Sequence, residues 1–171
     1  YCGGLNTGAR LSIERNAGWA LGEGMADGHI TVAGRAGMSC GAAMNGGVIH
    51  VKGDTGPRCG VAMKGGTIVV EGKLGYQSGF MAHQGKIIAL GGAGESCGDA
   101  LWEGEVWVAG PVESLGVDVN VVEPTAEEVA EGDKILDPLG LVDSSREWRK
   151  MISGQRLWYF ESRDASAWLM I

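Results

Sequence analysis

The sequence is short of several residue types, and each shortage excludes a class of protein. Lysine and arginine supply only 14 residues against 21 aspartates and glutamates, so the basic surface that nucleic-acid binding requires is absent. No apolar run approaches the roughly 18 residues of a membrane-spanning helix, and no signal peptide is visible. We therefore expect a cytoplasmic protein that has neither nucleic acid nor membrane as a partner.

Proline is also scarce, with four residues, whereas glycine is abundant, with 31 of the 171 positions. Hydrophobic residues make up 44% of the chain, which is too many for a disordered glycine-rich linker. This combination is typical of a fold in which glycine turns corners between buried apolar positions. The order of the glycines shows what that fold is.

Glycine recurs at a fixed period of 19 residues through five units. The first column contains Gly18, Gly37, Gly56, Gly75 and Gly94. Three further glycine columns lie 4, 10 and 16 residues after it, in every unit. Four uninterrupted columns indicate a repeat architecture in which each unit forms one rung of a stack.

Apolar residues follow the same period. Position 7 of the units, counted from the first glycine, holds Met25, Met44, Met63, Ala82 and Leu101. Position 12 holds Ile30, Ile49, Ile68, Ile87 and Val106, and position 14 holds Val32, Val51, Val70, Ala89 and Val108. A degenerate unit precedes the five, because Gly3, Leu11 and Ile13 fit the same columns. About six rungs are therefore expected.

Between the glycines at positions 10 and 16, each unit has a short run that alternates apolar and polar residues, such as residues 29–33. Alternation with β-branched residues predicts a strand with one buried face. Because that strand returns in the same direction in every unit, the chain must coil, and neighbouring strands must stack about 4.8 Å apart. We predict an all-β fold, a right-handed parallel β-helix over residues 1–116, with a helical and extended appendage over residues 117–171.

The four cysteines, Cys2, Cys40, Cys59 and Cys97, all fall at position 3 of their units and share one column with Leu21 and Ser78. No C-x-x-C pair is present, so buried free thiols are favoured over a disulfide, and a metal site ranks last. A reduced compartment fits this interpretation.

The three histidines, His29, His50 and His83, fall in three different columns. A zinc site needs three or four converging ligands, which these columns do not provide. Glycine-rich runs such as residues 22–24 lack the following helix that a phosphate-binding loop needs. We expect no catalytic, cofactor-binding or metal-binding residue in this chain.

One outward column is unusual. Position 13 lies between two buried positions and reads Ser12, Thr31, His50, Val69, Ile88 and Trp107. Its last three members are apolar neighbours on successive rungs, and an exposed apolar stripe normally marks a contact. We predict that Val69, Ile88 and Trp107 form a contact stripe covered by the C-terminal appendage or by a partner subunit.

After the repeat, residues 117–122 are typical of a strand, and Thr125-Ala-Glu-Glu128 is a capping box that predicts a helix ending near Pro138. A second helix is predicted over residues 145–152, with a serine cap and Gly154 as its stop. The remainder, residues 155–171, is rich in large apolar side chains. It is expected to cap the solenoid or to clamp a partner.

The segments Met-Asn-Gly-Gly-Val-Ile-His-Val-Lys-Gly (44–53) and Met-Lys-Gly-Gly-Thr-Ile-Val-Val-Glu-Gly (63–72) resemble the GXGXG β-helix family. The resemblance covers residues 3–110. This family includes the C-terminal domain of the glutamate synthase large subunit and the C subunit of formylmethanofuran dehydrogenase. As a separate short chain, the protein looks most like the stand-alone glutamate-synthase-like subunits, which include the middle subunit of N-methylglutamate synthase.

The resemblance implies a non-catalytic scaffold subunit with two partners: a glutamine-amidotransferase-like subunit, and a synthase-like subunit that binds FMN and an iron–sulfur cluster. Neither partner's active site maps onto this chain. One alternative is the C subunit of a formylmethanofuran dehydrogenase or of a formyltransferase/hydrolase complex. Another is an independent β-helix protein that acts on carbohydrate. It ranks last, because the outward column His29, Val48, Thr67, Lys86, Glu105 shows no aligned groove of carboxylates.

Overall fold

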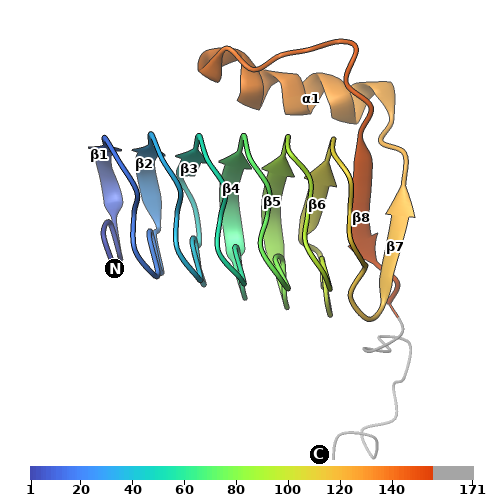
Figure 1. Ribbon diagram of the computed structural model, residues 1–171, viewed down its shortest axis with the longest axis horizontal. Coiled ribbons are helices and arrows are strands. Elements are labelled where there is room, and N and C mark those ends of the chain that lie inside the picture. The colour runs from blue at the N-terminus through green and yellow to red at the C-terminus, as the bar shows by residue number, and fades with distance from the viewer. Residues whose placement is uncertain (156–171) are drawn as a thin grey trace, which may run out of the picture.

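The computed structural model of the chain describes residues 1–155. Six parallel strands run in sequence order along one sheet, and two strands from the appendage complete it in the order β6-β8-β7, with β8 antiparallel to both of its neighbours (Figure 1). The parallel strands are β1 (Thr7–Ile13), β2 (Asp27–Val32), β3 (Val48–Val51), β4 (Lys64–Val70), β5 (Gln84–Ala89) and β6 (Glu105–Val108). The strands of the appendage are β7 (Val119–Val122) and β8 (Arg149–Ser153). The predicted role of the apolar tail falls on residues 156–171, which lie outside the described residues.

The register of the sheet repeats the 19-residue period. Ile30 lies beside Ile49, Ile49 beside Ile68, and Ile68 beside Ile87, and the column ends at Val106. Every unit therefore makes one circuit and places its strand directly on the preceding one. The predicted β-solenoid is confirmed, with about five circuits between β1 and β6.

The core is a set of ladders that run along the solenoid axis. The columns at positions 12 and 14 are fully buried from β2 to β6, and the position-7 methionines lie beneath them. The cysteine column also points inward, since Cys40, Cys59 and Cys97 are all 0% exposed. Each rung has one apolar side that only its neighbours can cover, so stability is shared between adjacent rungs.

Glycine is required at two kinds of corner. Gly60 has a φ of +69°, and a Cβ there would lie 2.3 Å from Cδ1 of Ile87 on the next rung. Gly75 has no such backbone requirement, but its Cβ would lie 2.4 Å from the carbonyl carbon of Gly56 on the preceding rung. Both distances are shorter than any van der Waals contact, so a side chain at either corner would separate the rungs.

Backbone hydrogen bonds join the rungs outside the sheet as well. At the corner of the third unit, the amide of Gly60 donates to the carbonyl of Cys40 at 2.7 Å, on the preceding rung. Two residues later, the amide of Ala62 donates to the carbonyl of Phe80 at 2.8 Å, on the following rung. Each rung is thus bonded to both neighbours on more than one side of the circuit, and the backbone polar groups of the corners are satisfied.

Helix α1 (Ala126–Leu136) begins where the sequence predicts. The side chain of Thr125 accepts from the amide of Glu128, and the Glu128 carboxylate accepts from the amide of Thr125, which completes the capping box. A short 3₁₀ helix, η1 (Asp137–Leu139), follows, so the predicted end near Pro138 is also confirmed.

The predicted second helix over residues 145–152 is wrong, because residues 149–153 form strand β8. This strand is inserted between β6 and β7, and its Met151 lies opposite both Val106 and Val121. The edge of β6 presents unpaired backbone groups and an open core, and pairing there outweighs the local helical signals. The appendage therefore continues the sheet of the repeat region.

Replacing Gly75 with alanine is expected to lower the free energy of unfolding by about 2–3 kcal/mol, because the new methyl group would overlap the backbone of Gly56. Gly18→Ala is the matched control. Gly18 occupies the same column in the first full unit, and a Cβ there meets nothing within 4 Å. Its effect should stay within about 0.5 kcal/mol. Urea unfolding followed by circular dichroism measures both variants, and equal losses would contradict this account of the corner.

Candidate functional site

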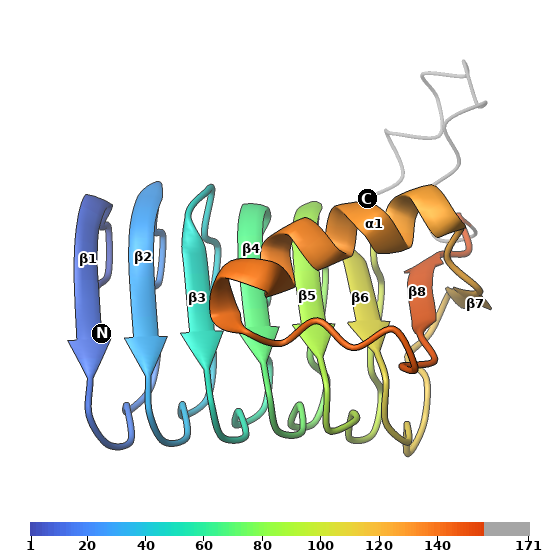
Figure 2. The ribbon, with the colours of Figure 1, turned by 90° about the horizontal axis from the view of Figure 1, so that it is seen from above.

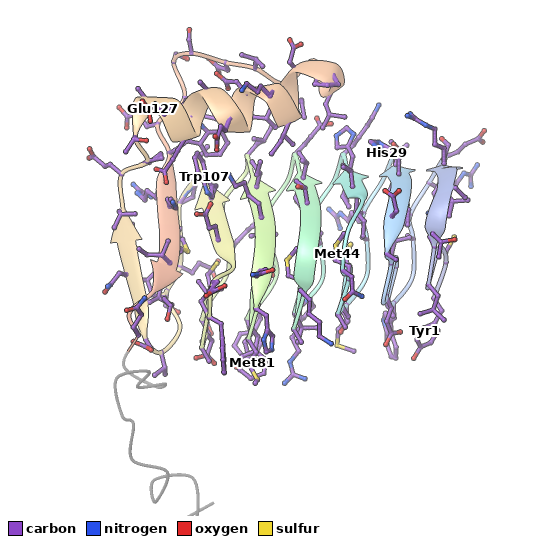
Figure 3. The ribbon with its side chains drawn as sticks, turned by 180° about the vertical axis from the view of Figure 1, so that it is seen from behind. Tyr1, His29, Met44, Met81, Trp107 and Glu127 are labelled. Carbon is purple, nitrogen blue, oxygen red and sulfur yellow. The ribbon has the colours of Figure 1, made fainter. Side chains whose placement is uncertain are left out.

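The structure places Val69, Ile88 and Trp107 side by side under helix α1. Their exposed fractions are 0%, 1% and 1%. Figure 2 shows the helix lying across the strands, and Figure 3 shows Trp107 beneath it. The side chains that pack on the stripe are Val129, Ile135, Leu136, Leu139, Leu141 and Trp148, with Leu90, the residue that follows β5. The chain's own appendage is thus the cover of this stripe.

Trp107 is the centre of this contact. Its ring meets the edge of the Trp148 ring at a centroid distance of 5.9 Å, with an angle of 68° between the planes. Its indole nitrogen donates to Glu105 Oε2 at 3.0 Å, and the Lys86 ammonium lies 4.5 Å from the ring centroid. The tryptophan therefore buries a large apolar area while its single polar atom stays satisfied.

Four charged side chains form what we call the lysine–glutamate network, and three of them, Lys86, Glu105 and Lys150, contact Trp107. The ammonium of Lys150 lies 2.8 Å from Glu105 and 2.5 Å from Glu128, and Lys86 lies 3.5 Å from the other oxygen of Glu105. Lys150 is only 7% exposed. The network joins β5, β6, β8 and α1, so it fixes the helix over the last rungs of the solenoid.

The network keeps its charges despite partial burial. Burial alone would raise the pKa of Glu105, but hydrogen bonds from Lys150 and Trp107 lower it below the ordinary glutamate value. Burial likewise acts to lower the pKa of Lys150, and its bonds to Glu105 and Glu128 raise it above the ordinary lysine value. Opposite shifts on the two partners are typical of a structural ion pair, since each group stabilises the charged form of the other.

The cysteines are free thiols, and three of the four are enclosed by the core. The pKa of Cys40 is raised well above its ordinary value by its hydrogen bond with Cys59 and by burial. Burial raises the pKa of Cys97 to about 12. A buried thiol with a raised pKa is a poor nucleophile and a poor metal ligand, so this ladder behaves as apolar packing.

The three histidines make unrelated contacts. His50 is bonded to Glu71 at 2.9 Å, whereas His83 stacks on Trp102 at a centroid distance of 5.1 Å. The pKa of His29 is lowered by burial, and then by the charges of Arg10 and His50. Within residues 1–155, no group of three or more histidine, cysteine, aspartate or glutamate side chains could hold a metal ion.

Neither of the two smaller grooves was found from the sequence. One, of about 340 Å³, is lined by Asp54, Lys73, Tyr76, Glu95 and Glu113. Asp54 pairs with Arg35 at 3.3 Å, and Lys73 pairs with Glu113. The other, of about 310 Å³, is lined by Lys64, His83, Gln84, Trp102 and Glu103. Column analysis missed the first groove because its carboxylates come from different columns, at the corner where one unit passes into the next.

A third groove, of about 730 Å³, lies among β7, the start of α1 and residues 146–149. Its walls include Val121, Val122, Trp148 and two arginines. Arg146 donates to the carbonyl of Leu141 at 2.8 Å, and Arg149 donates to that of Gly110 at 3.3 Å. Both guanidinium groups therefore help to hold the appendage in place.

A scan against protein-family models finds no match for this chain, and a search of curated proteins finds none either. Any functional conclusion therefore has to be drawn from the chain's own residues. Among the described residues, no helix combines the length and the apolarity that crossing a membrane requires.

The Glu105→Gln variant tests the lysine–glutamate network. Its free energy of unfolding at neutral pH should be about 1–3 kcal/mol lower than that of the wild type, because a charge-assisted bond to Lys150 is lost. The pKa of Glu105 is depressed in the folded state, so its contribution is complete above the unfolded value of about 4.5 and disappears as the pH falls below it. The difference between wild type and variant should therefore shrink between about pH 5 and pH 3.

Thermal unfolding across that pH range measures the effect. Glu127→Gln serves as the control, because Glu127 is an exposed carboxylate in the first turn of the same helix. A difference between wild type and E105Q that did not change with pH would contradict the assigned role of the Glu105 charge.

Because three of the four thiols are buried, we expect the cysteines to differ in their reactivity toward a thiol reagent. In the native protein only Cys2, which is exposed, should react promptly with Ellman's reagent. Cys40, Cys59 and Cys97 should react only after denaturant opens the stack. The Cys2→Ser variant should lose the prompt phase entirely, and a second prompt thiol in that variant would show that the core column is accessible.

Proposed function

We propose that this chain is a non-catalytic scaffold subunit of a glutamate-synthase-like multi-subunit flavoenzyme, with N-methylglutamate synthase as the specific candidate. The observation that supports it is the placement of the two segments that carry the family resemblance. Residues 44–53 and 63–72 occupy equivalent positions on neighbouring rungs, and each contains a strand of the sheet, β3 or β4. The resemblance therefore rests on the repeating geometry of a β-solenoid and not on isolated glycines.

The physical properties of the solenoid suit a scaffold. Its rungs are joined by the sheet and by the corner hydrogen bonds, and its interior is continuously packed. Six strands at the usual spacing make a stack about 24 Å long. Groups attached to different rungs keep a fixed separation, which is what holding two catalytic subunits in register requires.

In this proposal the chemistry belongs to the partners. A glutamine-amidotransferase-like subunit and a synthase-like subunit carrying FMN and an iron–sulfur cluster would assemble on the chain in the cytoplasm. The chain's own ionisable groups have structural tasks: the lysine–glutamate network holds α1, and the buried thiols fill the core.

The test is to purify the native complex through this chain, to record its visible absorption spectrum, and to weigh the subunits that co-purify. A flavin spectrum, with one amidotransferase-sized and one synthase-sized partner, is the expected result. A molybdenum or tungsten pterin partner would instead favour the formylmethanofuran dehydrogenase alternative. A colourless, solitary chain would overturn the scaffold proposal and direct attention to the groove beside Tyr76 as a carbohydrate site.

A further inference from the structure

The side of the solenoid opposite to helix α1 carries a second apolar surface. We call it the apolar face, and its main residues are Met38, Val61, Ala62, Tyr76, Phe80 and Met81. Tyr76 is 48% exposed and Met81 is 39% exposed, and the other four are partly exposed. Figure 3 shows Met81 at the far side of the molecule from the helix.

The repeat explains why these side chains gather. Positions 3, 4 and 7 of each unit point into the core, as Cys59, Gly60 and Met63 do in the third unit. Positions 1, 5 and 6 are at least partly exposed in the third and fourth units, and stacking places equivalent side chains about 4.8 Å apart. In the second to fourth units these positions are apolar. The result is a continuous strip of the kind that marks an interaction site on soluble proteins.

Acidic residues lie toward both ends of the apolar face, and the first full rung also carries Trp19, which is 68% exposed. Glu23 and Asp27 lie on the first full rung. Glu95, Asp99 and Glu103 lie on the fifth. An apolar centre with a charged rim is the composition of a protein–protein interface.

The two smaller grooves lie along the remaining borders of the face. Tyr76 stands at the edge of the groove that Glu95 and Glu113 also line, and the stacked rings of His83 and Trp102 line the other. Aromatic-lined depressions beside an apolar strip accept the large anchor side chains that contribute most of the affinity in interfaces.

The charges argue against a second copy of this chain as the occupant. If two apolar faces met about a two-fold axis along the solenoid, the first rungs would oppose each other, and Glu23 would face Glu23. If the axis ran across the solenoid, the first rung would oppose the fifth, and Glu23 and Asp27 would face Glu95 and Asp99. Both arrangements bring acid against acid, which is unfavourable at an interface.

We propose that the apolar face is the docking surface for a different protein subunit, whose own contact surface is apolar at its centre and carries lysine or arginine at both ends. This deepens the proposed scaffold function, since it identifies the side of the scaffold that a catalytic partner occupies. The opposite side is already covered by α1.

The test compares two alanine-to-lysine substitutions in the complex reassembled from its separated subunits. Ala62→Lys places a long charged side chain in the centre of the apolar face, and Ala130→Lys makes the same change on the exposed side of α1. Ala62→Lys should weaken subunit binding at least about tenfold in sedimentation or interferometry assays, and Ala130→Lys should leave it unchanged. Binding by the wild-type chain should weaken as ionic strength rises, because the acidic rims attract a basic partner.

A second variant covers the case in which A62K does not fold, as judged by circular dichroism. Glu95→Lys changes only an exposed rim residue, and it should slow association and flatten the dependence on ionic strength. Unchanged binding by folded A62K, or self-association of the wild-type chain through this face, would overturn the docking surface.

The outcomes separate this inference from the proposed function. Flavin-containing subunits that bind folded A62K as tightly as wild type would leave the scaffold role standing and overturn the docking surface. If the bound partner contains no flavin and the A62K variant fails to bind it, the docking surface would stand and the flavoenzyme scaffold role would be overturned. A wild-type chain that binds no other subunit would overturn both.

Discussion

The close stacking of one rung on the next is the constraint on which the rest of this molecule depends. It requires corners without side chains, as at Gly75 above Gly56, where even a methyl group would meet backbone at 2.4 Å. Once the corners are in contact, the backbone groups of adjacent rungs come within hydrogen-bonding distance on several sides of the circuit. The strand register, the ladders of like residues and the burial of the thiols all follow from that contact.

Stacking also determines which part of the solenoid has to be covered by another segment. Each internal rung covers its neighbours, but the last rung leaves the edge of β6 and the end of the core open. The appendage resolves this by inserting β8 beside β6, which places Met151 against Val106 in the core and Lys150 beside Trp107 on the outer side. A single strand thereby closes the core and supplies the cation of the lysine–glutamate network, and α1 is held through that cation.

This dependence on stacking explains what the sequence could and could not predict. The repeat region was predictable because a fixed period converts position in sequence into position in space, so the column of Val69, Ile88 and Trp107 could be placed on adjacent strands. Strand β8 was not predictable from the sequence, because its pairing with β6 joins residues about 40 positions apart and no repeat links them. The serine residues and Gly154 near it resemble helix boundaries locally, and only the open edge of β6 decides otherwise. The network was hidden for the same reason, since Glu128 and Lys150 lie outside the repeat.

The two long outer surfaces of the solenoid can be compared directly, because the same rungs build both. Beneath α1, the apolar side chains of three successive rungs are bordered by charged groups that bond to the covering helix. On the apolar face, Val61, Phe80 and Met81 occupy a comparable strip on two of those rungs, bordered by acids at each end. The first surface shows how this solenoid holds a cover: an apolar centre provides the area, and charges at the rim fix the position. The second also has an apolar centre, with acidic residues toward its two ends, and it therefore suits a cover that brings basic groups to those ends.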